Sequence, residues 1–213
     1  MDRVQHNGGT FGILAGVALA LLFITFASTG ATPDILGDPA RALPVLREKV
    51  MQWKLIGLFG ALTVGFGLPF TVGVYLRTRT GAPTRAVTAL LLVLVGLVGH
   101  ALGSLVVGAA FPAIAAVSDQ AVAAPAYVAV VASSVVADAL GNGFTGAGFL
   151  VFGWAIISTG VLSALLGWVF AAAGILGLLG AAVPELQIVF LGNILLTIVS
   201  LIWGGVALRR ALA

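Results

Sequence analysis

The sequence predicts an all-α polytopic membrane protein, a transmembrane helix bundle with six spans. Of its 213 residues, 61% are hydrophobic and only 8% are charged, whereas soluble domains carry about 25% charged residues. Several uncharged runs also reach the length of about 20 residues that crosses a hydrocarbon core of roughly 30 Å. A surface with so few polar side chains must face lipid, so we expect the chain to lie in the cell membrane with the bilayer as its solvent.

Composition also argues against several function classes. The chain has no cysteine, which excludes disulfides, thiolate metal sites and cysteine nucleophiles. The net charge is +3, but the basic residues are scattered at the ends of the apolar runs and form no patch, so a nucleic-acid partner is not expected. Because no Ser/His/Asp, carboxylate-pair or metal-ligand pattern is present, we assign no catalytic residue, no metal and no cofactor, and an enzyme is disfavoured.

The apolar runs divide the chain into six predicted spans within a single transmembrane domain, residues 1–213. They lie near residues 10–29, 53–76, 86–110, 143–160, 163–183 and 186–208. The first could be taken for a secretory signal because Arg3 precedes an apolar run. That run is as long as a full span, so it is interpreted as a retained first helix.

Residues 113–140 are apolar enough to suggest a seventh span. Asp119, Pro125 and Asp138 divide this run, and a seventh span would place Arg209 and Arg210 on the outer side. An outer-surface or re-entrant helix near residues 126–139 therefore fits better. With six spans and a cytoplasmic N-terminus, six basic residues lie inside and four outside, which agrees with the positive-inside rule and places both termini in the cytoplasm.

Between the first two spans, "GDPARALPVLREKVMQW" is typical of a capped surface helix. Asp38 is a natural N-cap residue, and Pro39 occupies the first helical position, where proline is favoured. Apolar residues then follow near helical spacing. We expect this helix to lie along the membrane surface before the chain turns into the second span.

The stretch "VVADALGNGFTGAG", residues 135–148, interrupts the apolar chain with an acidic residue and four glycines. Its glycines match G-x-G-x-x-G, but a dinucleotide site also needs a preceding strand and an acidic residue about 20 positions later. A turn that leads into the fourth span is the favoured interpretation. The functional alternative is a site at the membrane edge, where Asp138 and Asn142 lie beside a helix N-terminus that can bind an anion or a polar head group.

Polar side chains inside spans are costly, and they are therefore the best candidates for function. His100 lies near the middle of the third span, among glycines that allow a neighbouring helix to approach. It is either a satisfied core histidine or a ligand or proton carrier. In the sixth span, Asn193, Thr197 and Ser200 share one helical face with Gly204. This face forms either a hydrogen-bonded seam between helices or the lining of a path for a polar ligand.

The order of spans and loops along the chain is similar to that of a known group of proteins. An early glycine-containing span, "GILAGVALALLF", is followed by the "DPARALPVL" segment and by a second span that ends in a basic loop. Later come "FLVFGWAIIS", "LLGWVFAAAGILGLLG" and a final span that ends "IVSLIWGGVALRR". This order resembles a large group of bacterial membrane proteins with about six spans, known only as a domain of unknown function. The resemblance implies the six-span topology and brings no catalytic residues.

Three hypotheses for function follow from the sequence. The favoured one is a non-enzymatic accessory subunit or scaffold that packs against a protein partner or a second copy through small-xxx-small helix faces. The alternative is a small transporter or carrier of a lipophilic or weakly polar molecule, which would use Pro69, His100 and the Asn193 face. A third is a membrane enzyme acting on lipid or quinone through Asp138, Asn142 and His100.

Overall fold

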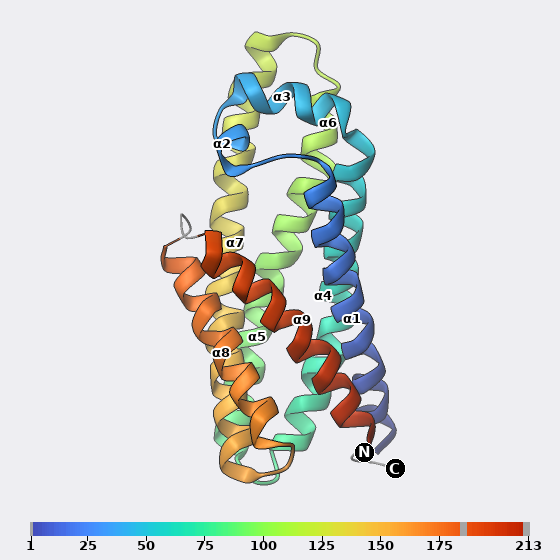
Figure 1. Cartoon of the computed structure of the whole chain (residues 1–213), viewed down its shortest axis with the longest axis vertical. Coiled ribbons are helices and arrows are strands. Elements are labelled where there is room, and N and C mark those ends of the chain that lie inside the picture. Colours follow the sequence, from blue (N-terminus) through green and yellow to red (C-terminus); the bar gives the residue numbers. More distant parts are fainter. Residues whose placement is uncertain (1, 184–186, 211–213) are drawn as a thin grey trace.

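The computed structural model describes residues 2–183 and 187–210, which form a bundle of long helices (Figure 1). Six of these helices are long and apolar enough to cross a membrane. They are α1 (Asp2–Ser28), α4 (Val50–Thr78), α5 (Pro83–Leu105), α7 (Gln120–Thr159), α8 (Ala164–Ala182) and α9 (Gln187–Arg210). Helix α5 continues through a π-helical turn, η1 (Val106–Ala110), into α6 (Phe111–Ala115). The described residues contain no strand, and the predicted all-α, six-span fold is confirmed.

The two ends of the bundle differ in structure. At one end α1 begins and α9 ends (Figure 1), and this end, which we call the arginine end, carries basic side chains: Arg3, Arg77, Arg79, Arg85, Arg209 and Arg210. At the opposite end the short helices α2 (Pro33–Leu36) and α3 (Pro39–Glu48) lie across α6 and the ends of α4 and α7 (Figure 1). We call these short helices, with α6 and the parts of α4 and α7 that touch them, the cap.

The cap has an aromatic core of its own around Trp53, which is 1% exposed. The Trp53 ring meets Phe111 edge-on, with 5.2 Å between ring centroids, and Phe26 at 6.2 Å. Tyr127 of α7 donates a hydrogen bond of 2.7 Å from its hydroxyl to the carbonyl of Leu36. Such edge-on aromatic pairs contribute about 0.5–1.5 kcal/mol beyond area burial and join α1, α4 and α6, while the Tyr127 hydrogen bond attaches α2 to α7.

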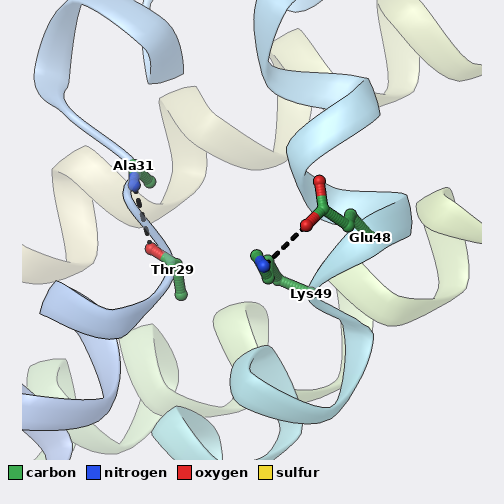
Figure 2. Close-up of polar contacts among 4 residues, drawn as sticks. All are labelled: Thr29, Ala31, Glu48 and Lys49. Carbon is green, nitrogen blue, oxygen red and sulfur yellow. Dashed lines mark hydrogen bonds and ion pairs between the residues drawn. The ribbon is translucent and has the colours of Figure 1, made fainter.

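Helix α3 forms where the sequence predicts it. The Asp38 carboxylate accepts a hydrogen bond of 2.9 Å from the backbone N–H of Ala40, and Pro39 is the first helical residue. Two local contacts mark the chain turns on either side (Figure 2). After α1, Thr29 Oγ1 accepts a bond of 3.1 Å from Ala31 N, and at the α3–α4 junction Lys49 pairs with Glu48 at 2.6 Å. This exposed ion pair adds little stability.

The stretch 135–148 corrects one prediction. The helix expected near residues 126–139 is present, but it is the first half of α7, which runs without a break over 40 residues from Gln120 to Thr159. The turn expected between that helix and a fourth span starting at residue 143 is therefore absent. Residues 113–140 also do not form a separate seventh span.

The glycines of this stretch serve helix packing. A Cβ atom added to Gly146 would lie 2.8 Å from the carbonyl oxygen of Gly174 on α8, and one added to Gly153 would lie 2.5 Å from that of Gly167. These distances are too short for any side chain. Inside a membrane each backbone N–H and C=O must be bonded within its own helix, so the glycine run stays helical and its bare surface admits α8.

The lengths of α7 and α8 show how far α7 extends beyond its neighbour. Helix α8 has 19 residues, roughly 28 Å, and just crosses a hydrocarbon core of about 30 Å. Helix α7 is roughly twice as long. A Cβ on Gly177, near the cap-side end of α8, would lie 3.1 Å from the carbonyl oxygen of Asn142. Asn142 therefore lies beside the cap-side end of α8, and the first half of α7 extends beyond α8 into the cap.

The close α7–α8 contact predicts unequal costs for two glycine substitutions. We expect Gly153→Ala to destabilise the protein by about 1–3 kcal/mol, because the added methyl group must push the two helices apart. Gly65→Ala on α4 is the control, since a Cβ there meets no atom within 4 Å. Thermal unfolding in detergent, followed by size-exclusion chromatography, measures the difference, and equal melting temperatures for the two variants would contradict the packing described.

Candidate functional site

An internal cavity of about 400 Å³ lies between α1, α4, α5, α7 and α9. This volume falls within the range of about 300–1,000 Å³ that is usual for small-molecule sites. Its walls are mainly apolar: Val93, Phe149 and Leu201 line the part toward the arginine end, and Trp53 and Phe111 line the part under the cap. The two ends of the cavity are therefore apolar.

The part of the cavity between these two apolar ends is polar. Three helices supply its side chains, which we call the polar belt: His100 and Ser104 from α5, Asp138, Asn142 and Thr145 from α7, and Asn193 and Thr197 from α9. Five of the six residues that the sequence singled out as candidates thus line one space. The three helices come from parts of the chain that are far apart in the sequence, and α9 crosses the bundle diagonally (Figure 1).

The crossing of α5 and α7 positions His100 and Asp138. A Cβ on Gly141 of α7 would lie 2.7 Å from His100 Nδ1, and a Cβ on Gly103 of α5 would lie 2.9 Å from Asp138 Oδ1. Each polar side chain therefore packs over a glycine of the other helix. The levels of the two side chains therefore differ by about one helical turn, roughly 5 Å, along the antiparallel helices.

Asparagine side chains connect α7 to α9. Asn193, which is 8% exposed, donates a hydrogen bond of 3.4 Å from Nδ2 to Asn142 Oδ1, and its own Oδ1 accepts one of 3.4 Å from the hydroxyl of Thr197. No Cα atoms of α7 and α9 lie within 8 Å of each other in the described chain. These side chains therefore bridge a space that the backbones leave open.

The predicted polar face of α9 is divided between two environments. Asn193 and Thr197 line the cavity, whereas Ser200 is 0% exposed, lies outside the cavity lining, and has no hydrogen-bond partner for its hydroxyl among the described residues. A Cβ on Gly204 would lie 2.9 Å from Phe70, so the lower part of this face packs into the core. Pro69 also lies outside the cavity lining.

Two residues of the polar belt, Ser104 and Thr145, were not among the predicted candidates. Ser104 follows His100 by one turn, and its hydroxyl donates a bond of 2.8 Å to the carbonyl of His100. Thr145 follows Asp138 and Asn142 at helical spacing, but this pattern is visible only once residues 135–148 are understood as helix. The buried hydroxyl of Thr145 has no partner among the described residues.

Helices α1 and α7 both line the cavity. These two helices line opposite walls, with Leu22 and Phe23 on α1 and Asp138 on α7, and they make no backbone contact with each other in the described chain. Their outer faces at this level are apolar: Ile24 is 64% exposed and Val136 is 61% exposed.

The chemistry available in the cavity is limited to hydrogen bonding and charge. His100 and Asp138 are its ionisable residues, and no lysine or arginine lines it. Within the described residues no group of three or more histidine or acidic side chains could hold a metal ion. The arrangement can bind the polar end of a small molecule at the polar belt and its hydrocarbon part against the apolar walls.

Comparisons of this chain with protein-family models, with curated proteins and with solved structures find no match.

The division of the α9 face predicts different reactivity at two neighbouring positions. Because the chain has no cysteine, single cysteines can be introduced without other changes. We expect Thr197→Cys, in the cavity, to react with N-ethylmaleimide at least about tenfold faster than Ser200→Cys, which is packed, since reactivity requires access to the thiolate. Mass spectrometry of timed samples in detergent measures both rates, and equal rates would place both residues in the same environment.

Proposed function

We propose that this protein binds and carries a lipophilic molecule with a polar end, which it takes up sideways from the bilayer. The observation that supports this most strongly is the convergence of His100, Asp138, Asn142 and Asn193, from three helices, on one cavity of about 400 Å³. Polar groups inside a membrane protein usually mark ligand pathways or binding sites. A cavity with one polar zone and apolar walls is suited to an amphiphilic molecule.

The depth of the polar belt supports the same class of ligand. We infer that Asp138 and Asn142 lie near the level at which lipid head groups begin. The support is that α8 has 19 residues, about enough to cross the hydrocarbon core, and that Asn142 lies beside its cap-side end. A molecule that moves sideways out of one leaflet already has its polar end at this level. It can therefore enter between α1 and α7 without moving its polar end through hydrocarbon.

The cavity favours the carrier hypothesis over the subunit hypothesis. A helix bundle whose purpose is to hold a partner is stabilised by filling such a space, because empty volume costs about 24 cal/mol per Å³. Here the space is retained and lined with costly polar groups. Association with a protein partner or a second copy through small-residue faces, and chemistry on a bound lipid or quinone, stay predictions.

We infer that both chain ends lie in the cytoplasm of a cell membrane. The support is that α1 begins and α9 ends at the arginine end (Figure 1), together with the basic loop that carries Arg79 and precedes α5. Cytoplasmic loops carry an excess of lysine and arginine. The polar belt then lies toward the outer leaflet, and the cap faces the outside.

Native mass spectrometry of the protein extracted with its lipid shell tests the proposal. We expect a reproducible small-molecule mass that remains bound to the wild-type chain. Leu97→Trp adds bulk to a side chain that lines the cavity and should lower the fraction of protein carrying that mass at least about tenfold, since 1.4 kcal/mol of lost affinity suffices for such a change.

Leu91→Trp is the matched control, because Leu91 lies on the same helix, is 58% exposed, and is not part of the cavity lining. It should retain the bound mass. A chain that carries no small molecule in any preparation, or equal retention by both variants, would refute binding in this cavity. A second protein at fixed stoichiometry would instead support the subunit hypothesis.

A further inference from the structure

The polar belt contains a carboxylate that no protein group neutralises. Asp138 is exposed to the cavity, and it has no hydrogen-bond or ion-pair partner among the described residues. Lys49 and Glu48, far away in the cap, form the ion pair found in that part of the chain. A lone charge next to apolar walls is costly, so a ligand of opposite charge gains most by binding here.

The hydroxyl groups around the cavity add to this negative character. Thr63, Thr71, Ser104 and Ser134 all line the cavity, and each donates its single proton to a carbonyl of its own helix at 2.8 Å. A hydroxyl whose proton is used in this way offers only its lone pairs to a ligand. These four groups therefore face the cavity as acceptors.

The asparagine bridge uses part of the hydrogen-bonding capacity of the polar belt. Asn193 uses one N–H to reach Asn142 Oδ1, and Thr197 uses its proton on Asn193 Oδ1. The cavity lining includes no lysine or arginine. The donors that remain, on the Asn142 and Asn193 amides and the Thr145 hydroxyl, are neutral groups. The carboxylate of Asp138 is therefore opposed by no lysine or arginine in the lining, which is complementary to a cation and unfavourable for an anion.

We propose that the ligand is a cationic amphiphile, an alkylammonium-type molecule whose positive head pairs with Asp138 while its hydrocarbon part lies against the apolar walls. This inference rests on the proposed function and specifies its ligand class. Asp138 is the binding residue that selects for charge. His100, packed over Gly141 one turn away, borders the head-group position on the same α5–α7 crossing.

Three probes with the same chain and different heads test the ligand class: radiolabelled dodecyltrimethylammonium, dodecanol and dodecanoate. Binding to the full-length protein in lipid nanodiscs is measured by equilibrium dialysis, and only the saturable part that Leu97→Trp removes is counted. We expect the cation to bind the wild type at least about tenfold more tightly than the alcohol, and the anion to bind most weakly.

Asp138→Asn should lower the affinity for the cation to about the affinity for the alcohol. Binding of the alcohol should persist, which shows that the variant is folded. Asp138→Glu should restore part of the preference. Asp119→Asn is the matched control: Asp119 caps the first turn of α7 by accepting a bond of 2.9 Å from Ala121 N, and asparagine caps helices equally well. It should behave as the wild type does.

Two results would overturn the inference, and they are distinguishable. If all three probes bind the wild type equally and Asp138→Asn changes nothing, the cavity binds amphiphiles without regard to charge, so the ligand class is wrong and the proposed function stands. If no probe shows binding that Leu97→Trp removes, the cavity binds no amphiphile, and the proposed function fails together with the inference.

Discussion

The structure depends on one constraint: in hydrocarbon, every backbone N–H and C=O must find its partner within its own helix. This constraint keeps α7 helical through a stretch rich in glycine and asparagine, residues that favour turns in water. Glycine then gains a different use, because a helix surface without side chains allows another helix to come close. At Gly146 and Gly153 the approach of α8 leaves no room for a Cβ atom. The same run of glycines that suggests a break in a soluble protein thus forms the packing surface of the longest helix.

The cavity follows from the unequal lengths of the helices. Helix α7 has 40 residues and α8 has 19, so α8 supports only the half of α7 that lies toward the arginine end. Helix α9 then crosses the bundle diagonally toward α1 (Figure 1), and it packs against α1 and α8 but makes no backbone contact with α7 in the described chain. A space bounded by five helices is left at this point. The hydrogen bond between Asn142 and Asn193 bridges it, which is a modest contribution, since such bonds average about 0.6 kcal/mol in membrane proteins.

The sequence predicted the features that depend on composition and on local chemistry. Hydropathy was sufficient for the six spans, and the Asp38–Pro39 pair was sufficient for the start of α3, because capping involves only neighbouring residues. It also selected most of the polar belt, since polar residues in spans are few. The sequence prediction failed for residues 135–148. There the turn preference of glycine and asparagine competes with the need of backbone groups in a membrane to form hydrogen bonds within a helix. The prediction also could not separate Thr197 from Ser200, because both share a helical face and only the packing of the surrounding helices decides which one is buried in the core.

The position of Asp138 connects the fold to the proposed ligand. A carboxylate deep in the hydrocarbon would be strongly destabilising, and one in the aqueous cap would be neutralised by water and ions. Asp138 packs over Gly103 and faces a cavity that no lysine or arginine lines. Its charge is therefore free to act on a molecule that arrives through the lipid. A carboxylate without a protein partner stabilises the bundle less than a neutral residue would, so its presence here favours a role in binding over a role in packing.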